Sequence, residues 1–181
     1  QRAQELVEPG GTYAFDSSTT GFEQVCALPD LPFRVITNAY AVLDQLVRYE
    51  RVELLSTGGR YHPKTQTFVP GDASAVLRRH NINRAFVSCI GLDPRRGASE
   101  GFEEQAEFKE SLIRVAEEVV LLVDSAKCNR RSEYFFAGLD ELTHIITDDG
   151  APAAFVRALR ASGRAVTVVK TGETPAVTRS R

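Results

Sequence analysis

The stretch Ala85-Phe86-Val87-Ser88-Cys89-Ile90, which continues into Gly91-Leu92-Asp93, indicates how the chain folds. It is a continuous, mostly apolar run without a charged side chain, and it lacks the strict alternation of a half-exposed strand. A short run of this kind is typical of a β-strand that is covered on both faces. Cys89 lies inside the run, where a small thiol is most simply a buried apolar residue. We therefore expect a strand of a buried sheet here.

Similar runs recur along the chain and alternate with segments in which apolar residues have helical spacing. The expected strands are Thr12–Phe15, Phe33–Thr37, Val52–Thr57, Ala85–Ile90, Val119–Val123, His144–Thr147 and Ala165–Val169. The residues with helical spacing are Ala39, Val42, Leu43, Leu46 and Val47, then Phe108, Leu112, Val115 and Val119, and last Phe155, Val156 and Leu159. Strand–helix–strand units joined by right-handed crossovers predict one α/β domain, a three-layer α/β/α arrangement around a mostly parallel sheet.

Other residues indicate where helices begin and end. One helix is expected to begin near Phe22 and a long one near Phe102. Pro152 suits the first turn of the last helix, and Ser162-Gly163 suits its end. The segment Gln1 to Val7 resembles the later part of a helix whose beginning is missing.

The composition is that of an ordinary globular protein, with 181 residues, 43% hydrophobic residues, 25% charged residues and a net charge of −2. These values exclude disordered and fibrous chains, and no apolar run approaches the roughly 18 residues of a membrane span. A net charge near zero also argues against strong nucleic-acid binding by this stretch alone. No signal peptide is recognisable, so we expect a cytoplasmic protein. The absence of Met suggests an excised fragment.

The three cysteines and three histidines do not form a known metal-binding or catalytic pattern. There is no C-x-x-C, no His at ligand spacing from a Cys, and no triad motif. The P-loop and dinucleotide-binding glycine patterns are absent as well. We therefore expect no metal, cofactor or catalytic residue. The residues concerned are Cys26, Cys89, Cys128, His62, His80 and His144.

Small, polar or hydroxyl-bearing residues follow five of the expected strands. Ligands of open parallel sheets bind just beyond the carboxyl ends of the strands, so these residues would share one edge of the sheet. The candidate ligand-binding residues are Asp16, Ser17, Ser18, Thr19, Thr20, Thr37, Asn38, Gly58, Gly59, Gly91, Lys109, Asp124 and Lys127.

The residue types alone leave simpler explanations open for each candidate. The segment 16–20 is an anion site or an ordinary helix cap, and the two adjacent glycines allow close approach of a ligand or form a turn. Asp124 and Lys127 either bind a ligand or form an ordinary surface ion pair. Lys109 reaches this edge or is solvated, as most lysines are.

Six short motifs follow one another in order over the region from Asp16 to Asp148. They are Phe15-Asp16-Ser17-Ser18-Thr19-Thr20, Val35-Ile36-Thr37-Asn38, Ser56-Thr57-Gly58-Gly59-Arg60-Tyr61 with Thr67-Phe68-Val69-Pro70-Gly71, Ile90-Gly91-Leu92-Asp93 with Gly97, Glu107-Phe108-Lys109, and Val123-Asp124-Ser125-Ala126-Lys127. They are similar to D-S-G-T-T, V-[IV]-T-N, G-G-x-[YL] with F-x-G, G-[IV]-D, E-x-K and D-x-[ST]-K. With these motifs the chain resembles the C-terminal effector-sensing domain of DeoR-type transcriptional regulators, bacterial repressors of sugar catabolism.

Three positions depart from the motifs of that family. Ser18 stands where glycine is usual, Pro70 precedes Gly71 where a smaller residue is usual, and Cys128 replaces a common aromatic residue. The change at Ser18 makes close backbone approach to a phosphate less certain, although its hydroxyl can still donate a hydrogen bond.

The resemblance implies a fold shared with ribose-5-phosphate isomerase, glucosamine-6-phosphate deaminase and CoA transferases. It implies a sugar-phosphate-sensing domain over residues 1–170, and Gly172, Pro175 and Ser180 lead us to expect a flexible tail over 171–181. It also implies a phosphorylated sugar as effector, bound by the candidate residues, and a homo-oligomer. Operator DNA would be bound only through an N-terminal winged helix–turn–helix that is absent from this chain.

Two enzymatic alternatives remain open. A sugar-phosphate isomerase or deaminase on the same fold needs a carboxylate as general base, and Asp93 and Glu107 are the available candidates. A CoA transferase needs a nucleophilic glutamate, for which Glu100 is the only formal candidate, in a segment expected to be a turn-rich loop. No paired acid and base is recognisable, so a sensor without enzymatic activity is the preferred hypothesis.

Overall fold

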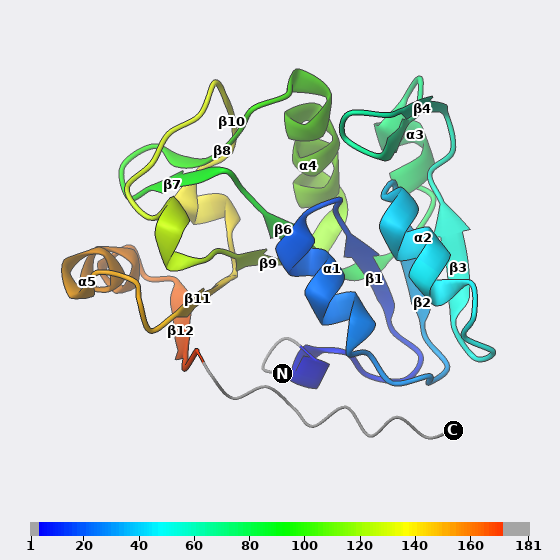
Figure 1. Cartoon of the computed structure of the whole chain (residues 1–181), viewed down its shortest axis with the longest axis horizontal. Coiled ribbons are helices and arrows are strands. Elements are labelled where there is room, and N and C mark those ends of the chain that lie inside the picture. The colour runs from blue at the N-terminus through cyan, green and yellow to red at the C-terminus, as the bar shows by residue number, and fades with distance from the viewer. Residues whose placement is uncertain (1–3, 172–181) are drawn as a thin grey trace.

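The computed structural model describes residues 4–171 and contains a seven-stranded parallel sheet (Figure 1). The strands of this sheet are β1 (Thr12–Phe15), β2 (Arg34–Thr37), β3 (Glu53–Ser56), β6 (Ile82–Ser88), β9 (Ala116–Leu122), β11 (His144–Asp148) and β12 (Ala165–Val169). The helices are α1 (Thr19–Cys26), α2 (Tyr40–Leu46), α3 (Ala73–Leu77), α4 (Glu103–Val115) and α5 (Ala153–Ala161), with 3-10 turns at Gln4–Leu6, Ser125–Lys127 and Leu139–Glu141.

The order of the strands places a topological switch point in the middle of the sheet. The order is β12-β11-β9-β6-β1-β2-β3, and every neighbouring pair is parallel. From β1 the chain moves outward through β2 and β3, and it then crosses back to β6 and continues in the opposite direction. In such sheets the crevice beyond the carboxyl ends of the two central strands is the usual place for a ligand.

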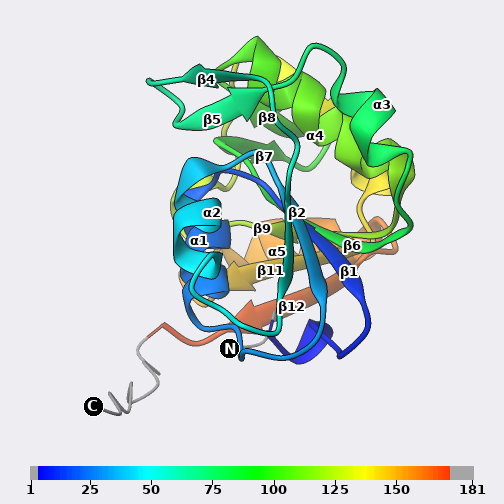
Figure 2. The same ribbon diagram turned by 90° about the vertical axis from the view of Figure 1, so that its right-hand side faces the viewer.

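Both faces of the sheet are buried because alternate residues of each strand belong to two different apolar clusters. In β1, Ala14 belongs to one cluster, whereas Tyr13 and Phe15 belong to the other. The cluster with Ala14 includes residues of α3, α4 and α5, and the cluster with Phe15 includes residues of α1 and α2. This arrangement makes the predicted three layers, and Figure 2 shows α1 and α2 side by side.

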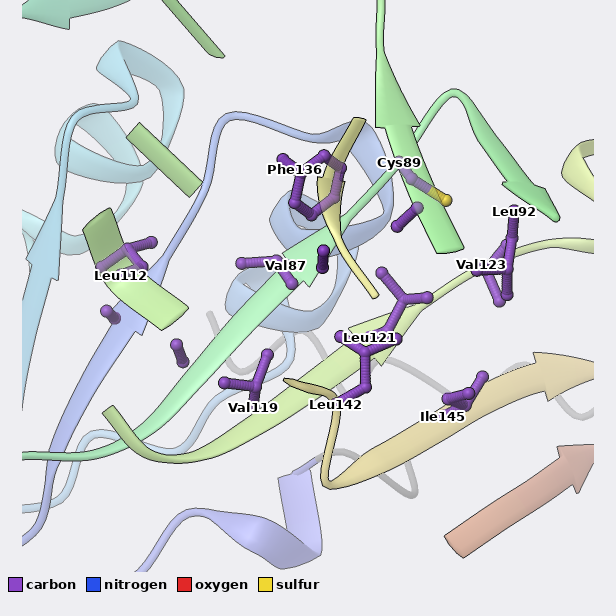
Figure 3. Close-up of a cluster of buried hydrophobic side chains, with 14 of the residues drawn as sticks. Val87, Cys89, Leu92, Leu112, Val119, Leu121, Val123, Phe136, Leu142 and Ile145 are labelled. Carbon is purple, nitrogen blue, oxygen red and sulfur yellow. The ribbon is translucent and has the colours of Figure 1, made fainter. Parts of the chain in front are cut away.

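Figure 3 shows part of the cluster beneath α4. Val87 of β6 and Leu121 of β9 lie near Leu112 of α4 and Phe136. Leu112 and Leu121 are fully buried. Burying a side chain of this size stabilises the fold by about 1.5–3 kcal/mol. The strands have continuous apolar runs because side chains on both faces of the sheet are buried in this way.

Two small antiparallel elements were not expected from the sequence. One is a three-stranded sheet of β7 (Gly91–Asp93), β8 (Gly97–Glu100) and β10 (Tyr134–Ala137), and the other is a hairpin of β4 (Arg60–His62) and β5 (Thr67–Val69). Both lie with α4 at the same end of the molecule, at the top of Figures 1 and 2.

The seven predicted parallel strands and the α/β class are confirmed. The first helix begins at Thr19 rather than near Phe22, because Ser18 caps it. The long helix ends at Val115, so Val119, which fits the helical spacing, lies in β9, where it pairs with Ala85. Pairing with β6 therefore outweighs the helical pattern at this position.

The two ends of the chain also differ from expectation or lie outside the described residues. Within Gln1 to Val7, the described part contains a single 3-10 turn at Gln4–Leu6 instead of a longer helix. The tail expected over 171–181 lies outside the described residues except for Thr171. Among residues 4–171, no helix is long and apolar enough to cross a membrane.

Candidate functional site

Asp16 lies at the topological switch point and joins the ends of the two central strands. Its side chain is fully buried. Oδ1 accepts hydrogen bonds from the amide of Ser18 at 3.0 Å and from its hydroxyl at 2.5 Å. Oδ2 accepts from the amide of Ser88 at 2.8 Å. Asp16 therefore fixes the loop after β1 against the end of β6.

Lys109 is buried directly beneath this loop. Its Nζ lies 3.0 Å from Oδ2 of Asp16, donates to the carbonyl of Ser88 at 2.7 Å and donates to Oε1 of Glu100. Burial opposes the charge, but the carboxylates of Asp16 and Glu100 outweigh it and raise the pKa of Lys109 above its usual value. The ammonium group therefore stays protonated inside the domain.

The three acceptors around Lys109 use all of its hydrogen-bonding capacity. An ammonium group has three N–H donors, and here one points to each of Asp16, Glu100 and Ser88. Lys109 thus holds the site together, and no donor remains for direct contact with an effector. The structure also corrects the position of Glu100, which is the buried last residue of β8 and not part of a turn-rich loop.

The N-terminus of α1 opens onto the same edge of the sheet. The hydroxyl of Ser18 caps the helix by accepting from the amide of Gly21 at 3.0 Å. A side chain at Gly21 would come within 2.9 Å of that hydroxyl, which explains the glycine. The amides of Thr19 and Thr20 belong to the first helical turn and have no acceptor within the helix or elsewhere in residues 4–171, which is the usual arrangement of donors at a helix N-terminus that binds an anion.

Asp124 and Lys127 lie beyond the end of β9, the strand that neighbours β6 on the side away from β1. They form an ion pair of 3.0 Å. Nζ of Lys127 also lies 3.4 Å from the hydroxyl of Ser88. About a fifth of the Lys127 side chain is exposed, unlike Lys109, and Lys127 is therefore the cation of this site that solvent and ligand can reach.

The ends of β2 and β3 add a second group of polar side chains. The hydroxyl of Thr37 donates to the carbonyl of Phe15 at 2.7 Å and accepts from the amide of Ala39 at 3.0 Å, so its only donor is used by the protein and the side chain is buried. Oδ1 of Asn38 and the hydroxyl of Thr57 are buried and have no hydrogen-bond partner among the described residues. Asn38 also lines a cavity of about 320 Å³ between α4 and the segment after β5.

The three glycines predicted to contact a ligand differ in their surroundings. Gly59 has φ +104°, and a Cβ there would lie 2.2 Å from the carbonyl of Val69, so the glycine allows the β4–β5 hairpin to pack. A Cβ at Gly91 would lie 2.6 Å from the carbonyl of Arg130, which makes it a packing position as well. Gly58 has φ +67° and open space around it.

The carboxylates considered for catalysis are not arranged as a general base. Asp93 bonds Arg131 at 2.7 Å and accepts from two backbone amides, and the bond to Arg131 is the largest of the effects that lower its pKa. Glu107 is exposed on α4. Within residues 4–171, no group of three or more His, Cys, Asp or Glu is placed to hold a metal.

The candidate ligand-binding residues expected from the sequence did not include Ser88, Glu100, Gln105 and Thr57, and Glu100 was considered only as a nucleophile. Ser88 and Gln105 lie within expected elements, and no local pattern distinguishes a buried polar residue there from an ordinary one. Thr57 directly precedes the predicted glycines, and its position at the end of a strand was the available signal.

Comparison with known families decides the classification. Residues 1–149 match the DeoR C terminal sensor domain. The chain belongs to the DeoR family. This DeoR sensor domain is 34% identical over 173 residues to a putative aga operon transcriptional repressor of Escherichia coli O157:H7, a match that covers 94% of this chain and 63% of the relative. It is 33% identical to the HTH-type regulator YulB of Bacillus subtilis and 32% identical to the L-fucose operon activator of E. coli K12.

These two matches cover 92% and 82% of the chain but only 65% and 61% of the relatives. The DeoR sensor domain therefore spans slightly less than two thirds of the length of the regulators it matches. Among solved structures, the translation initiation factor eIF-2B of Pyrococcus horikoshii OT3 has a similar fold, with a TM-score of 0.52 and 10% identity. That match covers 78% of this chain and 58% of the other.

Proposed function

We propose that this DeoR sensor domain binds a phosphorylated sugar at the switch point between β1 and β6, and that binding changes the affinity of the whole regulator for its operator. The single observation that carries this proposal is the construction around Asp16. A fully buried carboxylate holds the loop that exposes the amides of Thr19 and Thr20. Lys127 faces the same crevice across Ser88.

The amides and Lys127 match the chemistry of a phosphate group. Backbone N–H groups at a helix N-terminus and an accessible ammonium group are both donors, and phosphate oxygens are strong acceptors. The name of one relative supports a sugar-related effector, since it is an L-fucose operon activator.

The arrangement favours a sensor over an isomerase or deaminase. A general base works best with a pKa near the working pH, whereas Arg131 and two amides lower the pKa of Asp93. Glu100 is engaged with Lys109 and lies beneath the Asp16 loop rather than in the crevice. The relatives are transcriptional regulators, which agrees with a role in binding rather than turnover.

The remaining parts of the proposal concern the whole regulator. We expect operator DNA to be bound by an N-terminal winged helix–turn–helix outside this chain, and we expect the regulator to act as a homo-oligomer in the cytoplasm, because proteins that bind paired half-sites are oligomers. The effector would act by binding one arrangement of that oligomer more tightly than another.

A thermal-shift screen with ribose 5-phosphate, glucose 6-phosphate, glucosamine 6-phosphate and L-fucose 1-phosphate tests the proposal. A ligand at 100 times its dissociation constant stabilises by about 2.7 kcal/mol, which gives a clear shift. For a ligand that binds, Lys127→Ala should weaken binding by about 30- to 150-fold, the equivalent of about 2–3 kcal/mol for a lost charge-assisted hydrogen bond. Turnover of any of these compounds would instead support an enzyme.

A further inference from the structure

A line of five polar side chains connects the β4–β5 hairpin with the Asp16 loop. It runs from His62 through Thr65, Thr67 and Gln105 to Ser17. The distances between successive hydrogen-bonding atoms are 2.9, 2.8, 2.9 and 2.9 Å. Thr67 is completely buried and Gln105 is 95% buried, so solvent does not compete for the hydrogen bond between these two residues. We call this line the relay.

The hydrogen bonds of the relay have a definite direction, and its first step fixes it. The backbone amide of Thr65 donates to Nδ1 of His62 at 3.3 Å. A backbone N–H can only donate, so Nδ1 must be an acceptor. The hydroxyl of Thr65 therefore also donates to Nδ1, and its single proton is used there.

This first step also determines the direction of the remaining hydrogen bonds. Because the proton of Thr65 is used, its oxygen accepts from the hydroxyl of Thr67, whose oxygen in turn accepts from Nε2 of Gln105. The carbonyl of Gln105 then faces Ser17 and accepts its hydroxyl proton. Ser17 thus has its only donor committed to the protein, and its oxygen keeps lone pairs for a ligand.

We propose that Gln105 is a positioning residue that makes Ser17 a hydrogen-bond acceptor, so that Ser17 selects the sugar hydroxyl of the effector and not its phosphate. This inference rests on the proposed function and divides the site into two parts. The amides of Thr19 and Thr20 donate to the phosphate of the effector, and a phosphate monoester above pH 7.5 is a dianion with no proton to donate. Ser17 requires a ligand group with a proton, and a sugar hydroxyl supplies it.

The first test needs no ligand. A long-range ¹H–¹⁵N NMR spectrum above pH 7.5 reports which ring nitrogen of a neutral histidine carries the proton. We expect Nε2–H for His62, with the signal assigned through its loss in His62→Gln. An Nδ1–H tautomer would reverse the relay and overturn the proposal.

The second test compares two probes by calorimetry at pH 8, methyl phosphate, which has no hydroxyl group at that pH, and whichever sugar phosphate of the screen binds the wild-type domain. Ser17→Ala and Gln105→Met should each weaken the sugar phosphate about fivefold, as expected for one neutral hydrogen bond. Neither should weaken methyl phosphate by more than twofold. The double variant should be no weaker than either single variant, because both remove the same acceptor.

Gln24→Met is the matched control, since Gln24 is also a buried glutamine, but its side-chain atoms have no hydrogen-bond partner among the described residues. It should change neither affinity.

If Gln105→Met does not fold, Thr67→Val removes the support of Gln105 with little change in shape and should give the same pattern. Equal weakening of both probes, or an unchanged affinity for the sugar phosphate, would overturn the role assigned to Gln105 and leave the proposed function standing. A wild-type domain that binds no sugar phosphate would overturn the proposed function as well.

Discussion

At the scale of single residues, the cluster of Asp16, Lys109 and Glu100 is the centre of the site. The sequence predicted that Asp16 and Lys109 belong to the site but not that they contact each other, because Lys109 lies on a helix far along the chain. Contact with Glu100 was not foreseen, since the short strand that carries it has no local signal. The chemistry of a buried ammonium group requires such partners, and only the tertiary structure supplies them.

We predict that Lys109→Met destabilises the domain by about 3–5 kcal/mol, because it leaves two buried carboxylates without their cation. Lys127→Met is the matched control, since its ion pair with Asp124 is partly exposed and should contribute less than about 1 kcal/mol. Urea denaturation at pH 7 measures both values. Similar losses for the two variants would show that the buried cluster is not a structural centre.

At the scale of elements, Gly97 allows β8 to pack against β10. It has φ +90°, and a Cβ there would lie 1.9 Å from the carbonyl of Ala137. We predict that Gly97→Ala costs about 1–3 kcal/mol more than Gly163→Ala, because overpacking is added to the strain of a positive φ. Gly163 has φ +79° and open space, so it provides the strain without the clash. Equal changes in unfolding free energy for the two variants would contradict this explanation.

His144 joins β11 to the edge strand β12 through a 2.8 Å hydrogen bond between its Nε2 and the hydroxyl of Thr167. Burial lowers the pKa of His144, and Arg84 lowers it further, while Glu118 opposes the shift. Below about pH 6.5 the unfolded chain therefore binds a proton more readily than the folded domain, so stability contributed by this residue is present above that pH and lost on acidification.

We therefore predict that the unfolding free energy of the wild-type domain decreases more between pH 7.5 and 5.5 than that of His144→Gln. His62 and His80 are the same in both proteins, so the difference isolates His144. Parallel pH profiles in guanidinium denaturation would show that its pKa is not lowered.

The strands of the domain differ in how well they could be predicted from the sequence. The parallel strands β1, β2, β6, β9 and β11 were predictable because each contains an apolar run that is buried between the helical layers. The edge strands β3 and β12 are only partly buried but contain apolar residues as well. The strands of the small antiparallel sheet and of the hairpin are three or four residues long, and Gly97–Glu100 contains small and polar residues whose burial comes from packing. Tyr134–Ala137 is the exception, since its aromatic run was a usable signal.

At the scale of the whole molecule, the sheet order explains why residues from distant parts of the sequence meet. The switch point lies between β1 and β6, and the loops after β1, β6 and β9 converge there. The candidate residues Thr37, Gly59 and Gly91 are occupied with internal bonds or packing, whereas Thr19, Thr20 and Lys127 keep groups for a ligand. The proposed site was thus predictable as an edge of the sheet, but only the structure separates residues whose groups are used within the protein from residues that we propose to bind the ligand.

Calorimetry with matched pairs tests the central claim most directly, using ribose, glucose, glucosamine and L-fucose against their phosphates. The amides of Thr19 and Thr20 together with Lys127 suit a phosphate and gain little from a neutral sugar. For the sugar that the domain recognises, the phosphorylated member should bind at least about 30-fold more tightly than the free sugar, equivalent to about 2 kcal/mol. Equal affinity for both members of every pair that binds would contradict the account.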